Sequence, residues 1–68
     1  MDKQKIGIKL EKLRKERGET MGEVAEAVGT TYAAISMYES GKRIPRDHIK
    51  ENISRHFGVP VEEIFFAE

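Results

Sequence analysis

The sequence predicts an all-α protein, a compact bundle of five short helices in which the second and third form a helix-turn-helix. Apolar residues recur at spacings of three or four along the whole chain, and no stretch shows the alternation typical of a strand. Glycines divide this pattern into segments, and the second and third segments are too short to be stable as isolated helices, so they must pack against the others. The 68 residues suffice for one domain, and without cysteine its core depends on packing alone.

The first helix is expected over residues 4–17. Gly18 follows it and supplies the left-handed residue with which many helices end. Lys and Arg crowd its last turns, which suits the negative C-terminal end of the helix dipole. Ile8 lies off the apolar line of this helix, whose core positions are Ile6, Leu10 and Leu13.

The central stretch, residues 20–39, has the pattern of a helix-turn-helix. Thr20 and Glu23 have the spacing of a capping box, which predicts a helix over residues 21–28. Gly29 stands where this helix must end and the chain must bend sharply. The small residue Ala25 stands where the two helices are expected to cross closely. The apolar positions expected to face inward are Val24, Ala25 and Val28.

The third helix is expected over residues 32–40, with Thr30 or Thr31 as its N-cap and Gly41 as its end. Its expected inward positions are Ile35 and Tyr38. Since both helices of the unit are short, they can persist only by packing against the rest of the chain.

The last third of the chain predicts a basic loop and two more helices. The loop covers residues 42–46, and the fourth helix covers residues 47–57 and ends at Gly58. Pro60 fits the first position of a fifth helix over residues 60–66. The apolar stripes of these helices are Ile49, Ile53 and Phe57 in the fourth, and Val61, Ile64 and Phe65 in the fifth.

The formal net charge is zero, but the charges are unevenly distributed. Residues 1–17 carry seven Lys or Arg against three acids, and residues 42–56 carry five against two. Residues 18–41 contain four acidic residues and no Lys or Arg, and residues 57–68 contain three acidic residues and no Lys or Arg. Two basic segments therefore flank the helix-turn-helix. If the fold brings them to one face they form a phosphate-binding surface, and otherwise they are ordinary solvated helix faces.

Other classes of function find no support in the sequence. No apolar run approaches the roughly 18 residues that span a membrane, and the N-terminus lacks the apolar stretch of a signal peptide, so we expect a soluble intracellular protein. His48 and His56 are expected to be solvated, and no metal is expected because no third ligand lies in reach. Glu62 and Glu63 are adjacent on a helix and do not face each other. We therefore expect no enzyme, no cofactor and no small-molecule ligand.

Five motifs spread over nearly the whole chain point to one known family. They are LRKERG at 13–18, EVAEAVGTT at 23–31, AIS at 34–36, YESGKRIP at 38–45 and FGVPVEEIF at 57–65. Through these motifs the chain resembles the phage repressor and Cro family, also called Xre-like regulators. The resemblance implies a single lambda-repressor-like DNA-binding domain over residues 1–68, which binds double-stranded DNA as a homodimer. It also implies a transcriptional regulator, often a repressor, in the cytoplasm of a prokaryote or encoded by a phage.

The same resemblance implies roles for particular residues. In that family the third helix lies in the major groove while the second crosses the backbone. The positions that read base edges correspond to Tyr32, Ala33 and Met37, with Ser36 on the same face. The positions that approach phosphates correspond to Thr31, Ser40, Lys42 and Arg43. A structural ion pair corresponds to Arg14 and Glu39.

The chain departs from the family at positions expected to contact DNA. Met21 stands where the family usually has a glutamine that bridges the phosphate backbone and the third helix. The expected reading positions also lack the side chains that bond guanine or adenine through two hydrogen bonds. We therefore expect weak direct readout, a preference for A·T-rich sites, and greater dependence on phosphate contacts and DNA shape.

The resemblance implies that dimers meet near the C-terminus, and the residues there fit such a contact. Two consecutive phenylalanines cannot both enter one core, so Phe66 is expected partly outside it. We expect it to form an apolar dimer interface together with Val59, Pro60 and Val61. The alternative is that Phe66 folds back onto the first helix of its own chain. The alternative function for the whole scaffold is a protein-binding module, such as an antitoxin-like or anti-repressor subunit that uses an apolar patch around Tyr32 and Met37.

Overall fold

In the computed structural model, which describes residues 1–67, five α-helices follow one another and no strand occurs among those residues. They are α1 (Lys3–Glu16), α2 (Met21–Val28), α3 (Tyr32–Glu39), α4 (Asp47–Phe57) and α5 (Val61–Phe65). The predicted all-α fold is therefore confirmed. The expected bounds were wrong by one residue at several helix ends. Pro60 is the N-cap of α5 rather than its first helical residue.

The helix ends of the central unit follow the local sequence. The Thr20 hydroxyl accepts a hydrogen bond from the Glu23 amide at 3.1 Å, and the Glu23 carboxylate accepts one from the Thr20 amide at 2.8 Å. Gly29 ends α2 with φ +80°, a conformation that side chains disfavour. Thr31, not Thr30, caps α3, since its Oγ1 accepts from the Ala34 amide at 3.1 Å. The turn between the two helices is thus fixed at both ends.

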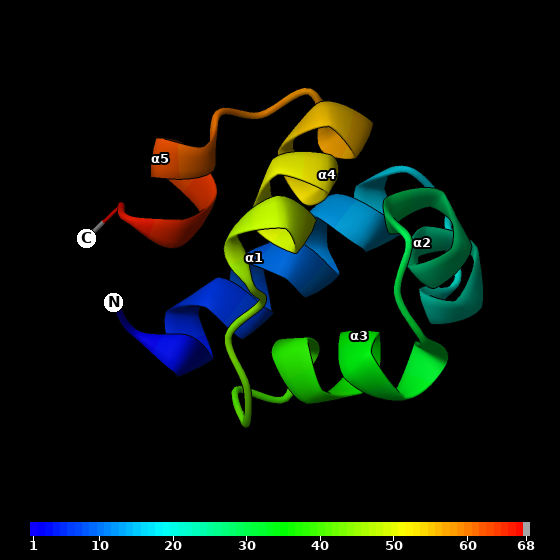
Figure 1. Cartoon of the computed structure of the whole chain (residues 1–68), viewed down its shortest axis with the longest axis horizontal. Coiled ribbons are helices and arrows are strands. Elements are labelled where there is room, and N and C mark those ends of the chain that lie inside the picture. Colours follow the sequence, from blue (N-terminus) through cyan, green and yellow to red (C-terminus); the bar gives the residue numbers. More distant parts are fainter. Residues whose placement is uncertain (68) are drawn as a thin grey trace.

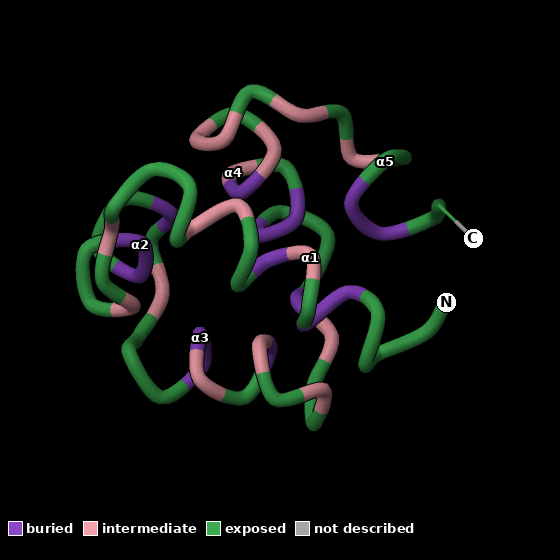
Figure 2. Tube along the Cα trace, turned by 180° about the vertical axis from the view of Figure 1, so that it is seen from behind, coloured by how far each residue is buried: buried purple, intermediate pink, exposed green. Residues whose placement is uncertain are grey.

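The helices enclose one core. In Figure 1, α1 crosses the middle of the molecule, α3 lies along the bottom edge, and the C-terminal end of α4 lies at the top. Helix α1 contacts α3 and α5, while α2 contacts α3 and α4. Figure 2 shows the buried segments of every helix turned toward this shared interior. The buried apolar side chains are Ile6, Leu10, Val24, Ala25, Val28, Ala34, Ile35, Tyr38, Ile49, Ile53, Ile64 and Phe65.

Gly7 allows α1 and α3 to approach closely. A Cβ atom at this position would lie 2.7 Å from the Tyr38 carbonyl oxygen and closer still to that of Glu39. Both obstacles are backbone atoms at the C-terminal end of α3, so they cannot move aside as a side chain would. The sequence does not reveal this role, because Gly7 stands at no turn or helix end and the apolar pattern does not single it out.

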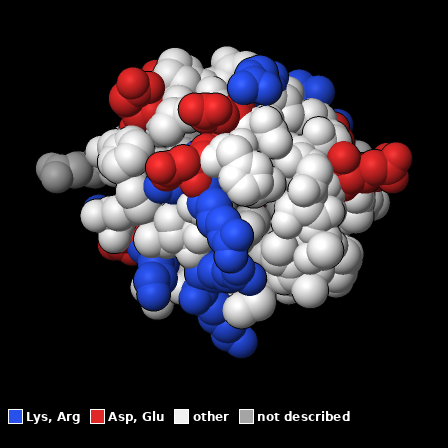
Figure 3. Space-filling view, viewed as in Figure 1, with Lys and Arg blue, Asp and Glu red and all other residues white. Residues whose placement is uncertain are grey.

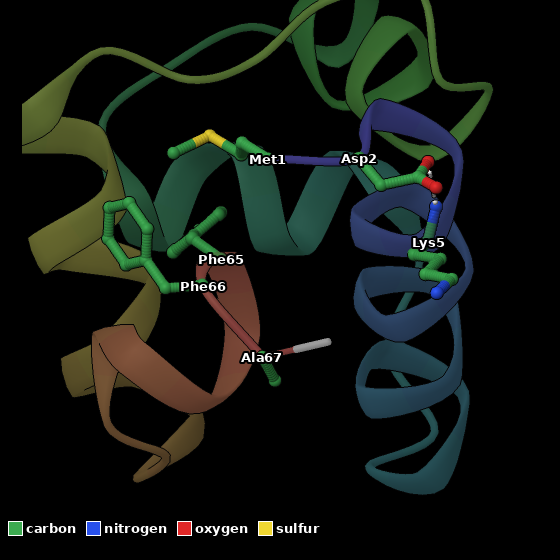
Figure 4. A pocket seen from close by; sticks show the side chains of 6 residues that line it. All are labelled: Met1, Asp2, Lys5, Phe65, Phe66 and Ala67. Carbon is green, nitrogen blue, oxygen red and sulfur yellow. Dashed lines mark hydrogen bonds between the residues drawn. The ribbon is translucent and has the colours of Figure 1, made fainter.

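Phe66 lies on the surface, as expected, with 54% of its area exposed. The Lys50 ammonium lies 5.4 Å from the centre of its ring and 5.8 Å from that of Phe65. Lys50 itself is only 9% exposed. In Figure 4, Phe66 stands on the α4 side of a surface hollow, and Lys5 of α1 and the α1 N-cap, Asp2, stand on the opposite side.

Candidate nucleic-acid interface

Helix α3 divides cleanly into an inward and an outward face. Ala34, Ile35 and Tyr38 are buried in the core. The other residues of the helix, apart from Glu39, form a reading face without ionised side chains. Tyr32 is 58% exposed and Met37 is 39% exposed. The structure therefore brings together, on one side of α3, the residues expected to read bases: Tyr32, Ala33, Ser36 and Met37.

The pair Arg14 and Glu39 fixes the C-terminal end of this helix. Arg14 donates to the two Glu39 carboxylate oxygens, from Nε at 2.7 Å and from Nη2 at 3.0 Å. Its Nη1 also donates to the Glu19 carbonyl oxygen at 2.9 Å. Both side chains of the pair are largely buried, 13% and 8% exposed. The hydrogen bond to Glu39 raises the pKa of Arg14, although burial opposes this shift. The pair thus holds α1, the α1–α2 turn and α3 together.

Unpaired positive charge lies in the loop between α3 and α4. Lys42, Arg43 and Arg46 are exposed, and none of them forms a salt bridge with any of residues 1–67. Figure 3 shows Lys and Arg side chains in a strip from the centre to the bottom edge of this view, over the loop and the start of α4. The basic end of α1 differs, because its last three cations are each paired with a glutamate: Arg14, Lys15 and Arg17.

A shallow hollow of about 230 Å³ connects this loop to the turn of the helix-turn-helix. Thr31, Arg43, Arg46 and His48 are among its lining residues. The Thr31 oxygen already accepts the capping hydrogen bond, but its hydroxyl proton can still be donated outward. These donors suit the oxygens of a phosphate. Arg46 and His48 were not among the expected DNA contacts, although Arg46 belongs to the basic run 42–46 that the sequence shows.

The remaining expected phosphate contact, Ser40, is exposed at the C-terminal end of α3. Its hydroxyl donates to the Met37 carbonyl oxygen at 3.2 Å, which leaves its oxygen available only as an acceptor while that bond persists. Ser40 and Ser36 line a second surface hollow of about 230 Å³ beside Met21. Met21 is half-buried and packs against the core, so the apolar side chain borders the reading face of α3.

His56 is not the solvated histidine expected from the sequence. Its Nε2 lies 2.9 Å from the Glu19 carboxylate, and its side chain is only 16% exposed. Arg17 Nε contacts the same carboxylate at 3.2 Å. Burial alone raises the pKa of Glu19, but the hydrogen bonds and positive charges of His56 and Arg17 outweigh it and lower this pKa. The contact joins the end of α4 to the α1–α2 turn. Its two residues are 37 positions apart in the sequence, so no local pattern predicts it.

The four residues expected at a dimer interface lie around α5, and their exposure differs. Val59 and Val61 are half-buried and pack against the core. Pro60 and Phe66 are exposed. Phe66 therefore offers the largest accessible apolar surface in this group.

Two classes of site have no counterpart in the described part of the chain. None of the helices within residues 1–67 is both long and apolar enough to cross a membrane. No group of three potential metal ligands from His, Cys, Asp and Glu gathers among those residues.

Fold and site together define a DNA-binding domain of the helix-turn-helix class, with an exposed second helix beside a free basic loop. A family model described as helix-turn-helix matches residues 10–64. The chain belongs to this helix-turn-helix family, and it is a DNA-binding regulator of transcription. The match confirms the resemblance to phage repressor and Cro-like regulators.

Solved structures share the fold. The chain is similar to the clp gene regulator ClgR from Corynebacterium glutamicum, with 21% identity and a TM-score of 0.85, over 97% of this chain and 70% of that chain. A second structure of the same regulator gives a TM-score of 0.81 at 21% identity, over 97% of this chain and 86% of that chain. No curated protein matches the chain significantly.

Proposed function

We propose that the protein is a repressor that binds a pseudo-palindromic operator as a homodimer, with α3 of each copy in the major groove. The observation that carries this proposal is the position of the unpaired cations. Lys42, Arg43 and Arg46 lie in the loop that directly follows the exposed helix, and Arg43 and Arg46 share a hollow with its N-cap, Thr31. Base edges and phosphates lie side by side on DNA, so one surface can contact both.

Selection of bound sequences from random DNA, followed by footprinting, tests this function. A dimer of this class places its two recognition helices about one helical turn, 34 Å, apart. We therefore expect two inverted half-sites with protected segments one turn apart. Enrichment of no sequence, or of a single unrepeated half-site, would contradict operator binding by a dimer. A reporter promoter that overlaps the selected site should fall in activity when the protein is expressed, and a rise would indicate an activator.

The dimer contact is tested separately by sedimentation of Phe66→Ala. Removal of this 54% exposed ring should shift the protein toward monomer, because it supplies the main accessible apolar surface around α5. Ile8→Ala is the matched control, since Ile8 is 67% exposed on α1 and lies outside this group. Equal sedimentation of both variants and the wild type as dimers would exclude Phe66 from the interface.

The alternative, a protein-binding module, draws on the same exposed side chains. Tyr32 and Met37 would then contact a partner protein instead of bases. This reading predicts co-purification with a protein and no gel shift with any DNA. It also predicts that substitutions of Lys42 and Arg43 leave partner binding largely intact, whereas they should weaken DNA binding for all sequences alike.

A further inference from the structure

The reading face of α3 is unusual in its chemistry. The only acidic residue of the helix, Glu39, has its carboxylate bound by Arg14 and 8% exposed, so it does not reach the groove. What remains toward solvent is the Tyr32 ring, the Ala33 methyl and the Met37 thioether, with the Ser36 hydroxyl half-buried between them. The half-buried Met21 side chain extends this apolar surface toward α2.

The major groove presents one apolar group, the C5 methyl of thymine. Guanine is read best by Arg or Lys, and adenine by Asn or Gln, each through paired hydrogen bonds. None of these four residue types occurs in α3. A methyl, a thioether and an aromatic edge instead match the thymine methyl, and burying such a group against them removes apolar surface from water.

We propose that Tyr32, Ala33 and Met37 recognise DNA through thymine methyl groups, so that the operator half-sites are rich in A·T pairs. This inference rests on the proposed function and adds the chemistry of its specificity. Affinity then comes from phosphate contacts of the basic loop, and sequence preference comes from methyl contacts of the reading face. The neighbouring unpaired cations, Lys42, Arg43 and Arg46, favour a polyanion over an apolar protein partner as the occupant of this face.

Replacement of thymine by deoxyuridine tests the proposal directly, because it removes the C5 methyl and keeps base pairing. The DNA is the site that selection returns, and single thymines are replaced one at a time. Affinity should fall about fourfold at each contacted methyl, the ratio expected for loss of one buried methyl-sized group. Replacement of cytosine by 5-methylcytosine at a neighbouring position, within reach of Tyr32, Ala33 or Met37, should not weaken binding.

Protein variants assign each methyl to a side chain. In Met37→Ala, the deoxyuridine effect should vanish at the thymine that Met37 contacts and persist at the others, which is the non-additivity expected of a direct contact. Tyr32→Ala should do the same at a different thymine. Ile8→Ala, on α1, should leave every deoxyuridine effect unchanged. All three positions are exposed, and thermal unfolding of each variant confirms that it remains folded.

The outcomes separate this inference from the proposed function. A G-rich selected site, or equal affinity for thymine and deoxyuridine DNA, would overturn methyl recognition. If Arg43→Gln still weakened binding in that case, the proposed function would stand. Absence of DNA binding altogether, with capture of the wild type but not of Tyr32→Ala by a protein partner, would overturn both.

Discussion

The two faces of α3 follow different rules. The inward face is fixed by specific partners: Ala34, Ile35 and Tyr38 are buried, and the helix end is held by Arg14 and by the close approach of Gly7. The outward face, with Tyr32 and Met37, has no such constraint. Stability and specificity are therefore separated within one eight-residue helix. Changes on the inward face should destabilise the protein, and changes on the outward face should alter binding alone.

The largest effect is expected for the ion pair. Arg14→Ala leaves the Glu39 carboxylate largely buried without its partner, and we expect a loss of about 3 kcal/mol in the free energy of unfolding. Arg55→Ala is the control, because its pair with Glu51 spans 3.8 Å between exposed side chains and should contribute about 0.5 kcal/mol or less. Urea unfolding measures both, and similar losses would show that the inward face is not specially fixed.

The close crossing of α1 and α3 gives the next effect. Gly7→Ala places a methyl against the backbone carbonyls of Tyr38 and Glu39, which should cost about 2 kcal/mol through displacement of α1. Gly22→Ala is the matched control in α2. Its Cβ would meet nothing closer than 3.9 Å, so the higher helix propensity of alanine should stabilise the protein by up to about 0.5–1 kcal/mol. Thermal unfolding should therefore shift in opposite directions, and a rise for both variants would contradict the crossing.

The outward face should respond in the opposite way. Met37→Ala removes a side chain that is 39% exposed, so its unfolding free energy should stay within about 0.5 kcal/mol of the wild type. Its affinity for the selected DNA should nevertheless fall, as the methyl contacts predict. A variant that lost stability instead of affinity would show that Met37 belongs to the scaffold.

The smallest effect concerns pH. Because the pKa of Glu19 is lower in the folded protein than its ordinary value, its contacts with His56 and Arg17 stabilise the fold above about pH 4.5, and this contribution is lost as pH falls through the lowered pKa. Glu19→Gln should therefore lose about 0.5 kcal/mol at pH 6 and less at pH 3. Glu26→Gln, at an exposed position of α2, is the control. A loss that is equal at both pH values would contradict the carboxylate's role.

The sequence predicts the scaffold better than the site. Helix ends follow from local chemistry, such as the Thr20–Glu23 box and the turn at Gly29, and the core follows from apolar spacing. Contacts between distant segments leave no periodic trace. The His56–Glu19 pair joins residues 37 apart, and the role of Gly7 depends on where α3 ends. The free charge of the basic loop also required the structure, because pairing distinguishes Arg43 from the equally basic Arg17.

Contact between the basic loop and the DNA backbone is the central element of the proposed function. The salt dependence of affinity for the selected DNA measures this contact, with Arg43→Gln compared with Arg55→Gln. Both substitutions remove one exposed arginine, but Arg55 lies in the C-terminal part of α4, at the end of the molecule opposite α3 (Figure 1). Arg43→Gln should reduce the slope of log affinity against log salt by about 0.9, the value for one phosphate contact, and Arg55→Gln should leave it nearly unchanged. Equal slopes for the wild type and both variants would contradict the DNA-binding surface described here.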